Sequence, residues 1–284
     1  MSTSPLYYAK KTQELCALSD VYITLNRMLS SDGCSLEQLA DAIAYEPAIA
    51  ASILKIANSA MFSMPRKIDS LSKALTILGI KEVKKLVNAY GITAAFSNLD
   101  PNVVDMDKFW EISVDCALIC QYFAKNKQIP NTDNIFLSGL FHNLGMLAMI
   151  SSEPAKVRYC EGYDRDETPW FRQNQVFGFT FADCTTELLK LWDLPDSIIQ
   201  PIAEFNGAEH EPLPDNSKLL YMASRLAVIN ADPGLYAKEA LIDKAILDDL
   251  GIESSDMSQS LEYCNEQAME LLATFPIQGR KSSE

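Results

Sequence analysis

Apolar residues recur along most of the chain at the three- and four-residue spacing of amphipathic helices. In residues 36–43 they fall on one helical face, and Ser35 with Gln38 fits a capping box at the helix start. The Val, Ile and Thr alternation that is typical of strands is scarce. We therefore expect an all-α protein. Further helical patterns cover residues 47–57, 70–79, 81–96, 109–123, 135–150, 181–192, 198–205, 219–229 and 261–272.

Breaks between these helices indicate how the chain is organised. Gly79 is a natural residue to end a helix, and residues 98–107 form the first convincing interruption of the pattern. We expect two helical lobes that share a tight interface, residues 1–97 and residues 98–284, the second ending in a polar tail. Residues 207–215 contain two prolines and should form a long surface loop.

The charge of the chain bears on its partners and its location. Its 284 residues carry a formal net charge of −14, which repels a phosphate backbone, so we expect no nucleic-acid binding. No apolar run approaches the length of a membrane span, and the N-terminus lacks a signal-peptide core. The seven cysteines are scattered without a C-x-x-C pair. We expect a reduced cytoplasmic protein that does not enter a membrane.

Residues 139–145 read Gly-Leu-Phe-His-Asn-Leu-Gly and contain the most informative position of the chain. A His-Asp pair on one helical turn can hold a metal ion, because imidazole nitrogen and carboxylate oxygen are both good ligands. Here the second residue is Asn143, whose neutral amide is a much weaker ligand. The segment therefore looks like a metal-hydrolase motif that has lost its charge.

Few other residues could complete a metal site. The chain has two histidines, and His210 lies in an acidic stretch that is typical of solvated surface. A catalytic metal normally takes three or more protein ligands, which His142 alone cannot supply. Carboxylates by themselves can bind hard ions, so Asp115, Asp183 and Glu187 remain formal candidates, although solvated helix surfaces account for them better.

Nucleophilic catalysis is poorly supported, because the sequence contains neither a Gly-x-Ser-x-Gly elbow nor a P-loop. Cys116 and Cys120 lie four residues apart on one helical face, which suits core packing better than a thiolate metal pair. A Cys/His dyad would have to combine His142 with one of these two or with Cys160 or Cys184.

Asn58 and Ser59 come at the end of a predicted helix, where short polar side chains bond free backbone groups. Their favoured role is to fix a corner between helices. The alternative is a surface for a partner, with Met61, Phe62 and Met64 as apolar neighbours.

Several fragments of the chain also occur together, in this order and spacing, in one known family. They are Glu46-Pro47, Leu54-x-x-Ala57-Asn58-Ser59, Ala74-x-x-x-Leu78-Gly79, Phe109-Trp110, the motif 139–145, Phe177-Gly178 and Leu188-Leu189-x-x-Trp192-x-Leu194-Pro195. Over roughly residues 20–230 the chain resembles the bacterial HDOD (HD-related output domain) family. Each fragment alone would be weak, but together they are quite specific.

The resemblance implies an all-helical fold whose C-terminal lobe is similar to the HD metal-dependent phosphohydrolases. Those enzymes hold metal with a His, a His-Asp pair and a later Asp. The corresponding positions of this chain are Ile112, His142-Asn143 and Ser224. Only His142 matches, so the resemblance implies a degenerate centre without a metal or other cofactor.

Two residues of this degenerate centre keep open alternatives. His142 suits a hydrogen-bonded core position, or else a residual small-molecule pocket. Arg225 could offer such a pocket an anion contact, although a structural ion pair is the simpler role. Extra histidines that are common in HD enzymes would fall near Phe181 and near Phe205-Asn206, where this chain has none.

The leading hypothesis is a non-catalytic signalling protein that binds a protein partner or a small ligand. The alternatives are a metal-dependent phosphohydrolase acting on a nucleotide or another phosphoester, and a cyclic-nucleotide receptor without turnover. The resemblance implies regulatory roles in bacterial signalling, sometimes connected with cyclic dinucleotide pathways. Since no receiver, GGDEF-like or EAL-like segment is visible, we expect a stand-alone domain that meets its signalling partners in trans.

Overall fold

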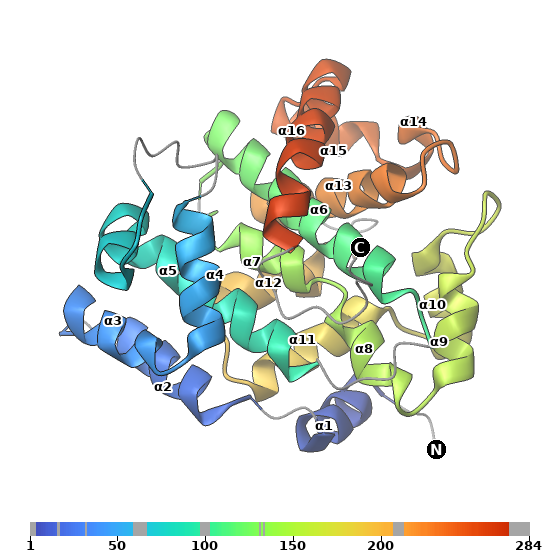
Figure 1. The fold of residues 1–284 in the computed structure, drawn as a ribbon. Helices are drawn as coiled ribbons and strands as arrows, with labels where there is room; N and C mark the ends of the chain where they lie inside the picture. Colours follow the sequence, from blue (N-terminus) through green and yellow to red (C-terminus); the bar gives the residue numbers. More distant parts are fainter. Residues whose placement is uncertain are drawn as a thin grey trace, which may run out of the picture. The chain divides into compact units, whose positions relative to one another are not determined.

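The fold is that of a computed structural model, which describes residues 4–15, 18–31, 33–58, 67–96, 103–130, 132, 134–206 and 213–272. These residues form helices α1 to α16 and contain no strand, so the predicted all-α class is confirmed (Figure 1). None of the helices in these ranges is long and apolar enough to cross a membrane.

The chain divides into two compact units. Unit 2 comprises residues 17–98 and 269–278, and unit 1 comprises the remaining residues, with α1 included. The sequence pattern predicted that residues 1–97 form one lobe. The structure instead places α1 (Pro5–Leu15) in unit 1, where it packs on α8 (Leu144–Ile150) and α11 (Phe181–Leu191). The helices of unit 2 are α2 (Asp20–Leu29), α3 (Leu36–Ala44), α4 (Pro47–Ala57) and α5 (Leu71–Ala95). The other helices are α1 (Pro5–Leu15), α6 (Met106–Asn126), α7 (Ile135–Phe141), α8 (Leu144–Ile150), α9 (Pro154–Glu161), α10 (Pro169–Phe177), α11 (Phe181–Leu191), α12 (Asp196–Glu204), α13 (Asp215–Ala231), α14 (Lys238–Leu241), α15 (Lys244–Leu250) and α16 (Ser254–Leu272).

Local sequence signals set the helix ends of unit 2. Ser35 and Gln38 form the expected capping box at the start of α3, and Pro47 occupies the first turn of α4, where a proline loses no hydrogen bond. Gly79 has φ 74° and interrupts α5. This left-handed conformation favours glycine, so the predicted helix end at Gly79 is confirmed as a break between two helical segments.

The core of unit 2 depends on a tyrosine that lies against α5. The hydroxyl of Tyr22 donates a hydrogen bond to Asn88 Oδ1 at 2.7 Å. Gly91, one turn further along α5, leaves space for the Tyr22 ring, because a Cβ at this position would lie 2.1 Å from Tyr22 Cδ2. The missing side chain therefore lets α2 pack closely on α5.

Unit 1 is organised around α6, whose central turns are buried on all sides and which packs against α7 and α13. Both glycines of the motif 139–145 serve close helix packing. A Cβ at Gly139 would lie 2.7 Å from Ala117 Cα on α6, and one at Gly145 would lie 1.9 Å from Phe181 O on α11. Because real Cβ contacts are wider than 3 Å, only glycine allows these approaches.

The single helix that we predicted over residues 135–150 is wrong. The structure has two short helices, α7 and α8, separated by a turn at His142 and Asn143. Asn143 has φ −113° and ψ 12°, outside the helical region. Both helices are buried all round, so apolar residues continue through the turn and helical periodicity could not reveal it.

We predict that Gly145→Ala destabilises the protein by more than about 2 kcal/mol, because the methyl group would collide with backbone that cannot move aside. Urea unfolding followed by circular dichroism measures the change. Gly162→Ala is the matched control, since its nearest neighbours lie 3.5 Å from the position that its methyl group would take and its expected cost is below about 1 kcal/mol. Equal costs for the two variants would contradict the packing argument.

Candidate functional site

The residues that the resemblance places at metal-binding positions lie in unit 1, on helices that pack against one another and on the turn beside them. Ile112 lies on α6, and His142 and Asn143 form the turn between α7 and α8. Ser224 and Arg225 lie on α13, which packs against both α6 and α7. All are buried except Asn143, which is half-buried. We call this group the degenerate centre.

His142 is held by its own turn and by an aromatic ring. Its Nδ1 lies 2.7 Å from the carbonyl oxygen of Gly139, and since a carbonyl only accepts, Nδ1 carries the hydrogen. The imidazole meets the ring of Phe205 edge to face, with centroids 6.1 Å apart. The hydrogen bond to a backbone carbonyl is the arrangement that orients many metal-binding histidines, and here it fixes a buried core histidine.

Cys116 is the thiol that the fold brings to His142, one turn beyond Ile112 on α6. Complete burial raises the pKa of Cys116 well above its ordinary value. The thiolate is the nucleophilic form, so this environment opposes the activation that a Cys/His dyad needs. Burial likewise raises the pKa of Cys184 to about 12.

Arg225 lies in the degenerate centre with its guanidinium against aromatic rings. The guanidinium carbon is 3.6 Å from the ring centroid of Tyr221 and 4.2 Å from that of Trp170. Its Nη1 donates to Ser224 Oγ at 3.0 Å and to the carbonyl oxygen of Tyr221 at 3.3 Å, and its Nη2 donates to Asn206 Oδ1 at 3.4 Å. Burial lowers the pKa of Arg225 to about 10, so the group remains charged at neutral pH.

The ion pair that we considered for Arg225 is not seen in the described ranges, where its hydrogen-bond acceptors are all neutral. Ser224 uses its hydroxyl to donate to Tyr221 O at 2.9 Å and also accepts from Arg225. The residues present do not fit a metal ion, because Ile112 offers no ligand and a cation stands beside the remaining ones. Across the part of the chain that the structure describes, no three His, Cys, Asp or Glu side chains are grouped to hold a metal.

The three acidic residues considered as ligands have other partners. Asp115 accepts hydrogen bonds from Asn230 at 2.7 Å and from Cys264 at 3.0 Å. Asp183 caps the start of α11, and Glu187 pairs with Lys190 at 2.9 Å. The last two line a pocket, and Asp115 does not.

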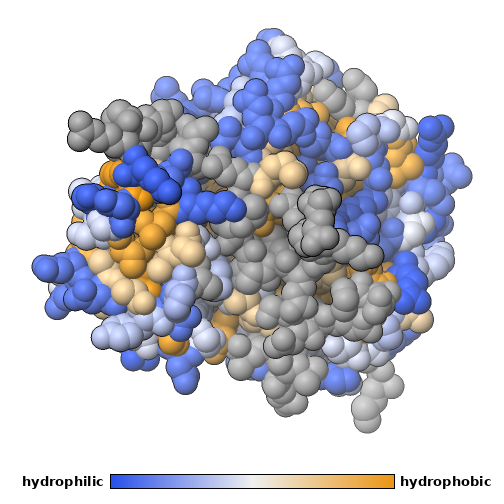
Figure 2. All heavy atoms as spheres, viewed as in Figure 1, coloured by the Kyte–Doolittle hydropathy of each residue, from blue (hydrophilic) through white to orange (hydrophobic). Residues whose placement is uncertain are grey.

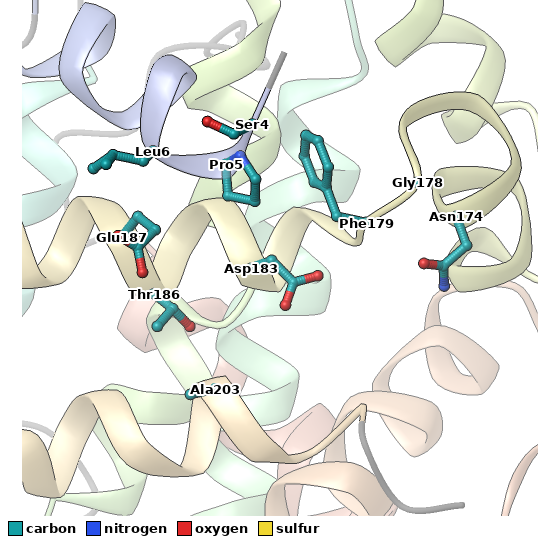
Figure 3. Close-up of a pocket in the computed structure, with 10 residues that line it drawn as sticks. All are labelled: Ser4, Pro5, Leu6, Asn174, Gly178, Phe179, Asp183, Thr186, Glu187 and Ala203. Atoms are coloured by element: carbon teal, nitrogen blue, oxygen red, sulfur yellow. The ribbon is translucent and has the colours of Figure 1, made fainter. Parts of the chain in front are cut away.

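A pocket of about 490 Å³ lies between α1, the α10–α11 turn, α11 and α12 (Figure 3). Asp183 and Glu187 line it from successive turns of α11, and Phe179 and Asn174 approach from the turn side. Among the lining residues that the structure describes, these two carboxylates carry the charge, and they repel phosphate groups. Its lining residues are Ser4, Pro5, Leu6, Asn174, Gly178, Phe179, Asp183, Thr186, Glu187 and Ala203.

A chain of hydrogen bonds joins this pocket to the degenerate centre. Thr180 donates from its backbone N and from its Oγ1 to Asp183 Oδ2, at 2.7 and 2.8 Å. Asn206 Nδ2 donates to Thr180 Oγ1 at 3.3 Å, and Asn206 Oδ1 accepts from Arg225 at 3.4 Å. Asn206, which lies near a position where the resemblance would place an extra histidine, therefore links the two sites in this chain.

Asn58 joins the end of α4 to Ile68 in unit 2. Its side-chain amide donates to Leu54 O and Ile68 O, each at 2.8 Å, and its Oδ1 accepts from Ile68 N at 2.7 Å. These bonds support the corner-fixing role. The proposed partner residues Ser59, Met61, Phe62 and Met64, and also His210, lie outside the described residues.

Sequence reasoning missed three residues that shape the degenerate centre. Tyr221 precedes Arg225 by one helical turn, which was a usable signal. Trp170 lies far from Arg225 in sequence, so no local pattern indicated it. Thr185 accepts a 2.7 Å hydrogen bond from the backbone N of Gly145, and its hydroxyl lies 3.2 Å from His142 O. It thereby holds both sides of the turn between α7 and α8.

A comparison with protein families identifies the chain. The sequence profile of the HDOD domain matches residues 15–207. The chain therefore belongs to the HDOD family, as the resemblance indicated.

The fold also occurs in solved structures. A protein of Shewanella amazonensis SB2B, provisionally named a phosphohydrolase, is 20% identical with a TM-score of 0.73 over 96% of this chain and 99% of its own. An HDOD domain protein of unknown function from Geobacter sulfurreducens is 18% identical, with a TM-score of 0.69 over 94% of this chain and 96% of its own. At this identity the similarity shows the fold alone.

Among curated proteins, an uncharacterized protein of Treponema pallidum (strain Nichols) is 21% identical over 208 residues. The match covers 72% of this chain and 40% of the relative, so the two proteins share a domain and not their whole length.

We predict that Thr185→Val destabilises the protein by about 1–3 kcal/mol, because it leaves the buried N–H of Gly145 without its acceptor. The measurement is urea unfolding. Thr186→Val is a closely matched control on the same helix, since the buried Thr186 hydroxyl bonds only to the carbonyl oxygen of Ala182 within α11. A larger cost for the control would refute the assigned role of Thr185.

Proposed function

We propose that this chain is a non-catalytic regulatory domain of bacterial signalling that acts by binding a protein partner or a small ligand. The observation that carries the proposal is the chemistry of the degenerate centre. Where the HD enzymes place four metal ligands, this chain has the apolar Ile112, the neutral Asn143, Ser224, and one histidine, His142. The hydroxyl of Ser224 is already used within α13.

Electrostatics supports the same proposal. The Arg225 guanidinium contacts Ser224 directly and shares the Phe205 ring with His142. A divalent ion placed roughly 5 Å from a unit positive charge, at an effective dielectric constant of about 20, is opposed by about 7 kcal/mol. An arginine can bind a phosphate beside a metal ion, but the hydrogen bonds of this guanidinium go to Tyr221, Ser224 and Asn206.

The surface of unit 2 supports a protein partner. Figure 2 shows hydrophobic residues gathered at the left, where Figure 1 places α3, α4 and α5. Among the large side chains of unit 2, Ile80 of α5 is 42% exposed, and the aromatic ring of Tyr45, at the end of α3, is 84% exposed. Exposed aromatic and apolar side chains are typical of protein contact surfaces. In this proposal the partners are cytoplasmic signalling proteins met in trans, with cyclic dinucleotide pathways as the family's precedent.

We expect protein purified without chelator or metal affinity to contain no stoichiometric Mn, Fe, Ni or Zn, and Asn143→Asp to gain no phosphoester hydrolysis. One restored carboxylate cannot complete a site that also lacks ligands at Ile112 and Ser224. Elemental analysis and assays with p-nitrophenyl phosphate, bis-p-nitrophenyl phosphate and a nucleotide panel make the measurement. Hydrolysis by either protein, or a bound metal, would favour the phosphohydrolase alternative.

Calorimetric titration of the same folded protein with cyclic mononucleotides and dinucleotides separates the two kinds of partner. Saturable binding without product formation would assign the chain to small-ligand reception. Absence of binding across the panel would leave protein partners as the target of the proposed regulatory role.

A further inference from the structure

Arg225 and Arg172 are both buried arginines in the described part of unit 1, but different groups offset their positive charges. Arg172 pairs with the carboxylates of Asp164 at 2.7 Å and Glu167 at 2.6 Å. Arg225 is 7% exposed and has neutral acceptors in the described ranges. Burying a charge without a partner is strongly unfavourable, so something else must stabilise the guanidinium.

Aromatic rings supply that stabilisation. The rings of Tyr221 and Trp170 lie 3.6 and 4.2 Å from the guanidinium carbon, well within cation–π range. The ring of Phe205 lies farther off, at 5.8 Å. We call Trp170, Phe205 and Tyr221 the aromatic cage. A planar, weakly hydrated guanidinium can stack on such rings, whereas a compact ammonium cannot do so equally well.

The cage holds the guanidinium among the segments that carry the family's metal-binding positions. From α13, Arg225 bonds to Ser224, the position of the last aspartate. Its cage residue Phe205 also contacts His142. Cys116, one turn beyond Ile112 on α6, forms a side-chain hydrogen bond with His142. One positive group thus bonds directly to the α13 position and shares the Phe205 ring with His142.

We propose that the guanidinium of Arg225 takes the place of a metal ion as the cation that organises the degenerate centre, and that the aromatic cage is a selective site for a guanidinium-type cation. This inference goes beyond the proposed function, since it concerns what holds the centre together. A catalytic metal would contradict the proposed function, whereas the cage is tested by the response of the folded protein to small cations.

The test empties the cage and refills it. Arg225→Ala is expected to lower the thermal midpoint by at least about 5 °C. Methylguanidinium chloride at low millimolar concentration should restore about 3–5 °C at ten times its dissociation constant. Methylammonium chloride at equal concentration should restore much less, and sodium chloride sets the background for ionic strength. Equal effects of all three salts would overturn the proposal.

Two further variants keep the result interpretable. In the double variant Trp170→Leu/Arg225→Ala the rescue should disappear, because one face of the cage is missing. If Arg225→Ala does not fold, Arg225→Lys serves instead. It keeps the charge without the planar stack, so its midpoint should fall below that of the wild type, and a midpoint equal to the wild type would count against the cage.

Three other outcomes would also refute the proposal. The first is a wild-type midpoint that falls with EDTA or rises with Mn²⁺, which would restore the metal. The second is an Arg225→Met variant more stable than the wild type, together with wild-type stabilisation by inorganic phosphate that the variant lacks, which would show an anion-binding role. The third concerns Glu209 and Glu211, the acidic residues on either side of His210. If Glu209→Gln/Glu211→Gln destabilises the protein as much as Arg225→Ala, and Arg225→Ala adds no further loss in that background, the counter-charge is a carboxylate.

Discussion

The close approach of short helices at two glycines is the constraint on which the degenerate centre depends. Gly139 lets α7 lie against the backbone of α6, and Gly145 lets α8 lie against α11. The turn between α7 and α8 carries His142, and its position follows from these two contacts. Thr185 then fixes the turn from α11 through its bonds to the backbone of residues on both sides. Packing therefore places the histidine, independently of any ligand.

Around that turn the protein replaces charge–charge contacts with neutral and aromatic ones. His142 is satisfied by a carbonyl oxygen and an aromatic edge, and Arg225 by ring faces and neutral acceptors. The carboxylates of Asp183 and Glu187 line the neighbouring pocket instead of the degenerate centre. The guanidinium of Arg225 and the carboxylate of Asp183 are thus joined only indirectly, by hydrogen bonds through Asn206 and Thr180.

Much of the fold followed from periodicity and end signals, because these are local. The capping box at Ser35 and the break at Gly79 are determined by residues within a few positions of each other. The turn at His142 escaped prediction, because it interrupts a stretch that is apolar on every face. The cage around Arg225 could be predicted only in part, since Tyr221 is one turn away on the same helix while Trp170 reaches it through tertiary packing. Family positions indicated where the degenerate centre lies, and side-chain geometry was needed to show what fills it.

The roles of Gly139 and Gly145 change what similarity to a hydrolase motif means. Both glycines are required by interhelical distance, and the one further contact of Gly139 with the histidine uses its backbone carbonyl, which any residue could supply. Helix packing alone therefore requires the two glycines, and a chain can keep them whether or not it keeps the metal ligands. Within this segment, the glycines indicate a shared fold. Only the histidine and the residue after it indicate whether the segment could bind a metal.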